Sequence, residues 1–379
     1  MGKSKHVLFF LVLTATLSSA LGAAWTTKKL TNAAAESYSS AIAVSGANVY
    51  VAWYGNAPGN FEVYFRRSTD NGATWQATKR LTYTDGQSGP PDIAANGANV
   101  YVTWNDNTPG NAEVYFKRSA DNGATWEPSQ RLTNNSGHSN YPRIAFSGAN
   151  LYLAWTDNTA GHANVYFRKS IDGGATWQSA KQLTNKSVDV GGADIVSYGS
   201  NIYIVWCDDS SGNREIYFKK STDKGASWQT QKRLTNNSGD SHDVAIAVDD
   251  LTGSDLYVVW EDDTAGNWEV YFMKSTDKGA TWETIKNLSN NAPGSWDPAI
   301  AVSGANVYVA WYDYTPGNSE IYMRKSADSG STWQTRQRVT NDSGDSLFPD
   351  IALGTANQYV TYYDNTPGNY QIYLKFSPL

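Results

Sequence analysis

Acidic residues and one arginine stand where they could act on a glycosidic bond. Each comes directly before an isoleucine that recurs along the chain, and these residues are Asp92, Arg143, Asp194 and Asp350. Glu261 is the one carboxylate at a second recurring position, directly after a repeated tryptophan. Two carboxyl groups on either side of a glycosidic bond can serve as general acid and as base or nucleophile. These five residues are therefore candidate catalytic residues.

Aromatic side chains form a second group with a chemical use. The position that holds Glu261 is a tyrosine in three other repeats. Aromatic faces stack on the C–H faces of sugar rings, while neighbouring carboxylates accept hydrogen bonds from the hydroxyl groups. The same rings could equally pack one loop against another. The candidate ligand-binding residues are Tyr54, Tyr312, Tyr363, Trp268, Trp296 and Tyr314, with Tyr38, Phe61, Phe348 and Tyr370 from the same loops.

The elements that must position these residues are tandem repeats. The motif STDNGATW at 68–75 occurs six times with small changes, at spacings of 51 or 54 residues. A fixed period of this length indicates a repeat architecture. In each copy the Asp can accept hydrogen bonds from its own turn, the Gly supplies a positive φ and the Trp leads a strand. Six equivalent copies cannot all be one active site, so we interpret these aspartates as structural: Asp70, Asp121, Asp172, Asp223, Asp277 and Asp328.

Counting each strand separately gives the number of blades. The first-strand isoleucine, the second-strand aromatic residue and the third-strand tyrosine each occur seven times, one more than the hairpin motif. Residues 25–31, WTTKKLT, match the fourth strand but have no partners before them. The N-terminal strand would therefore complete the last blade and close a ring. The predicted fold is all-β, a seven-bladed β-propeller of four-stranded antiparallel blades that start near residues 39, 90, 141, 192, 243, 297 and 348.

Composition bounds the compartment and the partners. Two lysines, an apolar run and small residues make 1–23 a predicted secretory signal peptide, too short to span a membrane, before a single propeller domain at 24–379. We expect a secreted or cell-surface monomer with no membrane span in the mature chain. The lone Cys207 excludes an internal disulfide, and the net charge of −6 argues against nucleic acid as a partner. No metal or cofactor is predicted; a cation such as calcium in the repeated acidic loops stays open.

The hairpin motif resembles the Asp-box, or bacterial neuraminidase repeat, of sialidase-like propellers. Its six copies extend over essentially the whole predicted domain. The resemblance implies that the Asp-boxes lie on one face and that the ligand binds on the opposite face. For a true sialidase it also implies three arginines around the substrate carboxylate, a tyrosine nucleophile assisted by a glutamate, and an aspartate as acid/base. The segment YPRIAF supplies only Arg143, so the arginine clamp on a carboxylate is incomplete.

We therefore expect a secreted propeller that binds a glycan or a protein partner without catalysis. A sialidase-like glycoside hydrolase is the first alternative, favoured if carboxylates pair across the mouth of the ring. A structural or adhesive cell-surface protein is the second, favoured by the near-identity of the repeats.

Overall fold

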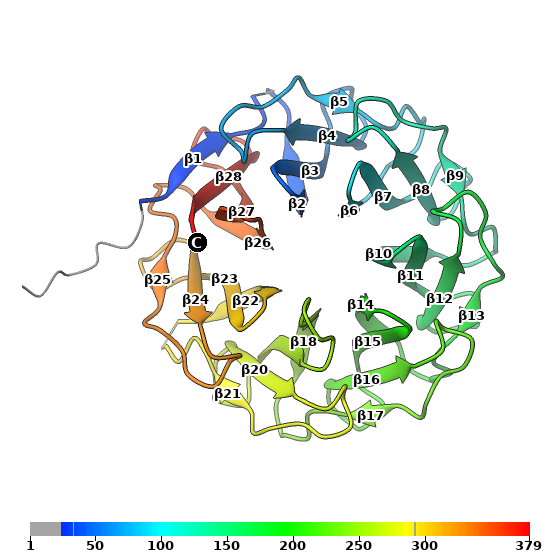
Figure 1. Ribbon diagram of the computed structural model, residues 1–379, viewed down its shortest axis with the longest axis vertical. Helices are drawn as coiled ribbons and strands as arrows, with labels where there is room; N and C mark the ends of the chain where they lie inside the picture. Colours follow the sequence, from blue (N-terminus) through cyan, green and yellow to red (C-terminus); the bar gives the residue numbers. More distant parts are fainter. Residues whose placement is uncertain (1–23, 33, 292) are drawn as a thin grey trace, which may run out of the picture.

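The chain folds as a ring of short antiparallel sheets around a central channel (Figure 1). The computed structural model describes residues 24–32, 34–291 and 293–379, and these residues form seven four-stranded sheets and no helix. The prediction of a seven-bladed propeller is confirmed. The predicted signal peptide, residues 1–23, lies outside the described residues.

The strands are grouped here by their distance from the channel, with the blades numbered in chain order. The innermost strands are β2 (Ser37–Ser45), β6 (Asp92–Asn96), β10 (Ser139–Ser147), β14 (Val190–Tyr198), β18 (Ser241–Val248), β22 (Ser295–Ser303) and β26 (Ser346–Leu353). The second strands are β3 (Asn48–Gly55), β7 (Asn99–Asp106), β11 (Asn150–Asp157), β15 (Asn201–Asp208), β19 (Leu256–Asp262), β23 (Asn306–Asp313) and β27 (Asn357–Asp364). The third strands are β4 (Glu62–Ser68), β8 (Glu113–Ser119), β12 (Asn164–Ser170), β16 (Glu215–Ser221), β20 (Glu269–Ser275), β24 (Glu320–Ser326) and β28 (Gln371–Pro378). The outer strands are β5 (Lys79–Arg80), β9 (Gln130–Arg131), β13 (Lys181–Gln182), β17 (Lys232–Arg233), β21 (Lys286–Asn287), β25 (Gln337–Arg338) and β1 (Thr26–Lys29).

The two ends of the chain meet in the seventh blade. Strand β1 pairs antiparallel with β28, with Thr26 opposite Phe376 and Lys29 opposite Tyr373. The order of that sheet is β1-β28-β27-β26, so its outer strand comes from the start of the chain. The predicted closure of the ring by the N-terminal strand is therefore confirmed.

The hydrophobic core lies between blades. The second strands are apolar at nearly every residue because each of their two faces packs against a neighbouring blade. Tyr50 and Ala52 of blade 1, for example, pack in one cluster with Val100 and Val102 of blade 2. Buried tryptophans such as Trp53 add the largest side chains to these interfaces. Truncating a buried residue of this size typically costs about 3–5 kcal/mol.

The eight-residue hairpins connect the third and fourth strands and fasten each blade to the blade before it. In the first copy the Asp70 carboxylate accepts hydrogen bonds from the Thr74 backbone N–H at 2.8 Å and from the Ser68 hydroxyl at 2.7 Å. In the second copy, Trp126 packs edge-on against Phe65 of blade 1 at 5.0 Å. The motif is therefore a self-contained turn that carries an anchor between blades.

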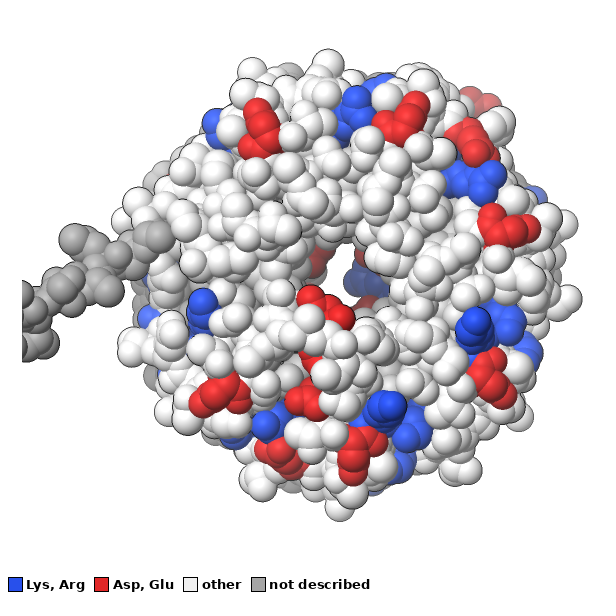
Figure 2. All heavy atoms as spheres, viewed as in Figure 1, with Lys and Arg blue, Asp and Glu red and all other residues white. Residues whose placement is uncertain are grey.

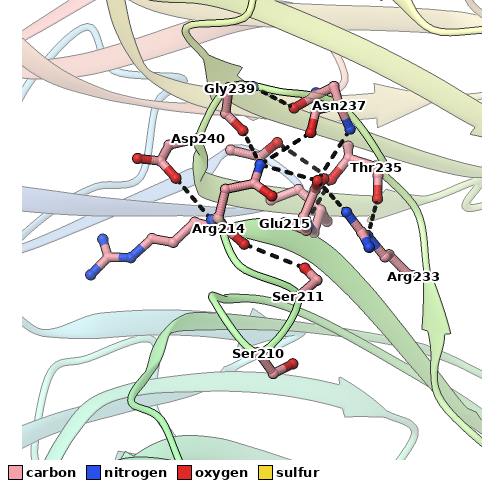
Figure 3. Close-up of polar contacts among 12 residues, drawn as sticks. Ser210, Ser211, Arg214, Glu215, Arg233, Thr235, Asn237, Gly239 and Asp240 are labelled. Atoms are coloured by element: carbon pink, nitrogen blue, oxygen red, sulfur yellow. Dashed lines mark hydrogen bonds and ion pairs between the residues drawn. The ribbon is translucent and has the colours of Figure 1, made fainter.

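Basic residues of the outer strands are also tied into the structure. Lys181 donates a hydrogen bond to the Ala226 carbonyl of the next blade at 2.6 Å. Figure 3 shows a second kind of brace, in which the fully buried Glu215 accepts hydrogen bonds from Arg233 and from the Asn237 backbone N–H at 3.1 Å. The recurring acidic residues of these loops therefore hold the loops in place.

Strand order gives the ring two different faces. The eight-residue hairpins and the turns between first and second strands lie on one face, which we call the hairpin face. The turns between second and third strands, and the connections from blade to blade, lie on the other, which we call the loop face. The first strands begin, and the second strands end, at the loop face.

Candidate ligand-binding site at the channel mouth

The site is built on a bulge near the start of the innermost strands. In six blades the pairing with the second strand slips at this point, for example between Trp296 and Ala299. Tyr141, Asp243, Asp297 and Phe348 have φ angles of 53°, 41°, 50° and 50° there. Positive φ is unfavourable for residues with a Cβ, and bulges are a common means of re-aiming a side chain. Strained positions of this kind cluster at functional sites.

A cavity of about 560 Å³ occupies the channel, lined by two tiers of side chains. Figure 2 shows that acidic and basic atoms lie inside the central opening. The bulge residues of six blades, together with Pro90 of blade 2, form the tier nearer the loop face, which we call the mouth tier: Ser39, Pro90, Tyr141, Gly192, Asp243, Asp297 and Phe348. The residues two positions later form the lower tier: Ala41, Asp92, Arg143, Asp194, Ala245, Ala299 and Asp350.

The lower-tier aspartates, three of the predicted catalytic candidates, connect neighbouring blades. Their carboxylates accept hydrogen bonds from the first-strand backbone of the next blade: Asp92 from Ile144 N at 2.7 Å, Asp194 from Ile246 N at 2.9 Å and Asp350 from Ile42 N at 2.9 Å. Burial raises the pKa of Asp194 to about 6 and that of Asp350 to about 7. The contacts give these three residues a bracing role.

Arg143 projects into the channel among these aspartates. Its charge lowers the pKa of Asp92 and of Asp194, although burial outweighs this effect in both. Within the described part of the chain its guanidinium makes no hydrogen bond or ion pair. The lower tier therefore contains one cation beside three carboxyl groups, and its other members are alanines.

The fifth candidate, Glu261, lies in a separate cluster of three carboxyl groups. Carboxylate oxygens of Asp243, Glu261 and Asp297 all lie within 4.8 Å of one another. The Asp297 backbone N–H donates a hydrogen bond to Glu261 Oε2 at 2.8 Å. Burial and the nearby Asp243 raise the pKa of Glu261 far above the usual range, and the same two causes raise that of Asp297 to about 8. Glu261 is 6% exposed, so it is a carboxylic acid held neutral at neutral pH.

Aromatic rings form a continuous arc over blades 6, 7 and 1 on the loop face. Seven rings follow one another, and each ring centroid lies between 5.2 and 5.9 Å from the next. In order along the arc they are Trp296, Tyr312, Phe348, Tyr363, Tyr38, Tyr54 and Phe61. Tyr370 packs against Tyr363 at 5.1 Å. We call these eight rings the aromatic arc. It meets the carboxyl cluster at Tyr312, where burial and the neighbouring Asp297 and Glu261 raise the pKa of the tyrosine hydroxyl.

Two of the sequence-predicted aromatic residues lie elsewhere. Tyr314 is 48% exposed and lies outside the chain of ring contacts. Trp268 packs edge-on against His242 at 5.1 Å, and His242 is the cross-strand partner of Glu261. Trp268 therefore lies beside the carboxyl cluster and not in the aromatic arc. Cys207 is buried, and burial raises the pKa of its thiol to about 12, which makes it unreactive.

Comparison with known proteins gives the fold a name. No protein-family model matches the chain. A xyloglucanase from Paenibacillus sp is 27% identical over 253 residues, which are 58% of this chain but only 23% of that protein. Polysaccharide lyase Uly1 superposes with a TM-score of 0.58 at 12% identity, over 90% of each chain. The Hadza microbial sialidase Hz136 superposes with a TM-score of 0.55 at 14% identity, over 84% of this chain and 73% of that one. The fold is that of the sialidase-like propellers.

The lower tier departs from an arrangement built to hold a carboxylate. Arg143 is its only arginine, and its other members are alanine and aspartate. Among the described residues, no helix is long and apolar enough to cross a membrane. The sequence pattern also predicts that Asp243 and Asp297 line an acidic mouth with the three lower-tier aspartates, but it does not predict that they converge on Glu261, because the bulge decides this.

Proposed function

We propose that this protein is a secreted glycan-binding propeller whose ligand lies on the aromatic arc at the channel mouth. The observation that carries the proposal is the unbroken sequence of ring contacts from Trp296 to Phe61, beside a cavity lined with carboxyl groups. Phe348 is 40% exposed at a strained position, so one of its faces is available to a ligand. Sugar rings stack on such faces while their hydroxyl groups donate to carboxylates. The similarity to a xyloglucanase supports a glycan as the ligand.

Calorimetric titration with soluble oligosaccharides tests this proposal. Phe348→Ala should weaken binding at least fivefold, because it removes the most exposed ring of the aromatic arc. Ile171→Ala is the matched control, since Ile171 is 59% exposed but belongs to an eight-residue hairpin on the opposite face. Equal affinities of the two variants for every sugar that the wild-type protein binds would rule out the arc as the site.

The carboxyl cluster supports cleavage of a glycosidic bond as a second candidate function. A protonated Glu261 could donate its proton to a leaving oxygen. Asp243 and Asp297 have oxygens within 4.8 Å of it, closer than the roughly 6.5–9.5 Å that seats a water between two carboxyl groups. The spacing therefore fits a carboxylate nucleophile better than a water-activating base.

Turnover separates the two functions. Aryl glycosides and polysaccharides, including xyloglucan, would be incubated with the wild-type protein and with Glu261→Gln. Product release that falls at least a hundredfold in the variant, with binding retained, would establish the enzyme. If the wild-type protein binds substrates of the panel but releases no product from any of them, the result supports the non-catalytic function.

A further inference from the structure

The mouth holds three carboxyl groups that no basic side chain of the protein pairs with. Asp243, Glu261 and Asp297 lie together, and none of them forms an ion pair within the described residues. The groups that most affect the charge of Glu261 are the other two carboxyls, and no cation is among them. Carboxyl groups that keep their protons because they crowd one another ionise more readily when a cation enters among them, so such a cluster favours a cationic ligand.

The nearest basic groups do not supply that cation. Arg214 donates a hydrogen bond to His242 Nδ1 at 2.9 Å, and its side chain points away from the Glu215 network (Figure 3). Burial and Arg214 lower the pKa of His242, which is therefore neutral at neutral pH. Arg143 lies in the lower tier, where Asp92, Asp194 and Asp350 each act on its charge more strongly than Asp243 does.

Aromatic faces adjoin the uncompensated carboxyls. Tyr312 stacks with Trp296, and its ring centroid lies 5.9 Å from that of Phe348. Burial and the neighbouring Asp297 raise the pKa of its hydroxyl group. Carboxylates next to aromatic faces are the combination that holds an ammonium group, through ion pairing and cation–π attraction. A sugar carboxylate at the same place would find no cation in the cluster with which to pair.

We propose that the mouth recognises an amino-sugar unit, one that carries a free, protonated amine, in preference to neutral or carboxylate-bearing sugars. The inference rests on the glycan-binding function proposed above and specifies its ligand. The aromatic arc supports the sugar ring, and Asp243, Glu261 and Asp297 surround the amine. Entry of the amine stabilises the ionised form of the cluster, so binding releases protons.

Four oligosaccharides of equal length test the preference: a glucosamine hexamer, its N-acetylated form, cellohexaose and hexagalacturonate. At pH 7 and low salt the glucosamine hexamer should bind at least tenfold more tightly than the other three. Its binding should release protons, measured by titration calorimetry in buffers with different ionisation enthalpies. Asp243→Asn should remove both the preference and the proton release, since it deletes one charge and keeps the side-chain shape.

Asp85→Asn is the matched control, because Asp85 is an exposed acid in a blade connection on the loop face, outside the cavity. Loss of the preference in Asp243→Asn but not in Asp85→Asn supports the proposal. A preference that persists in Asp243→Asn reflects general attraction to an acidic protein and overturns it. A neutral or acidic hexamer that binds as tightly as the glucosamine hexamer also overturns the proposed preference. The proposed glycan-binding function is kept in that case. If Phe348→Ala weakens the binding of none of the hexamers, the proposed glycan-binding function itself is wrong.

Discussion

At the scale of single residues, burial governs the carboxyl groups of the mouth more than pairing does. Glu261 and Asp297 are largely enclosed and face a third carboxyl group, so both favour the protonated form. The hairpin aspartates have the opposite environment. Asp70 lies at the surface, and hydrogen bonds led by the one from the Thr74 hydroxyl lower its pKa to about 2. The same side-chain type is therefore a structural acceptor on one face and a proton-holding group on the other.

This difference predicts how stability depends on pH. Asp297 has an unfolded pKa near 3.8 and a folded pKa of about 8, so the folded chain binds more protons between these values. Its stabilising contribution is complete below pH 4 and is lost as the pH rises through 8. The unfolding free energy should therefore fall between pH 4 and pH 8 by about 2 kcal/mol less in Asp297→Asn than in the wild-type protein. This difference is smaller than the whole pKa shift implies, because solvent enters the mouth. Urea unfolding of the wild-type protein and the variant at several pH values measures this difference. If the unfolding free energies of the two proteins change with pH in parallel, the prediction is wrong.

At the scale of elements, the bulge and the hairpin decide what each end of a blade does. The first-strand bulge turns Asp243, Asp297 and Phe348 toward the channel. In a strand without a bulge, the regular alternation of side chains between the two faces of the sheet would give these residues another direction. The hairpin brings its glycine against the neighbouring blade. A Cβ on Gly123 would lie 2.5 Å from the Phe65 ring, and the φ angle there is 79°.

A pair of glycine substitutions separates this contact from backbone strain. Gly97 has a φ of 59° and open space around its Cβ position. Gly97→Ala should lower the free energy of unfolding by about 1 kcal/mol, from strain alone. Gly123→Ala should cost about 3 kcal/mol, because the Phe65 ring must also move. Chemical denaturation compares the two variants, and similar losses would show that the hairpin does not press on the next blade.

The sequence predicts elements well where one residue type marks one strand position. The seven-fold recurrence of the first-strand isoleucine, the second-strand aromatic residue and the third-strand tyrosine counts the blades. Equivalent positions in neighbouring repeats become neighbours in space. That is why the aromatic arc could be anticipated from Tyr54, Tyr312 and Tyr363. The carboxyl cluster could not, because a bulge alters the register within a strand. The prolines that follow the bulge residue in three blades, Pro142, Pro298 and Pro349, are the available signal.

At the scale of the whole molecule, the ring is held by interfaces between blades and by one strand that closes it. Each blade packs on two neighbours, so an opening at any seam exposes the cores on both sides. Blade 7 depends most on distant sequence, because β1 covers the edge of β28. The Asp350 carboxylate of blade 7 adds a hydrogen bond to Ile42 N of blade 1, across the interface between the last blade and the first. The channel, and with it both tiers of the site, persists only while this seam is shut.

Removing the closing strand should therefore weaken the whole protein and not one blade alone. A chain that lacks residues 1–31 loses β1 and leaves the β28 edge unpaired. Such an edge exposes backbone donors and acceptors and promotes association between molecules. We expect a lower melting temperature and concentration-dependent aggregation, relative to a control chain that lacks only residues 1–23. A peptide of residues 24–32 added in excess should restore the melting temperature, because it can pair with β28. An unchanged melting temperature in the shortened chain would show that the contacts between blades close the ring without β1.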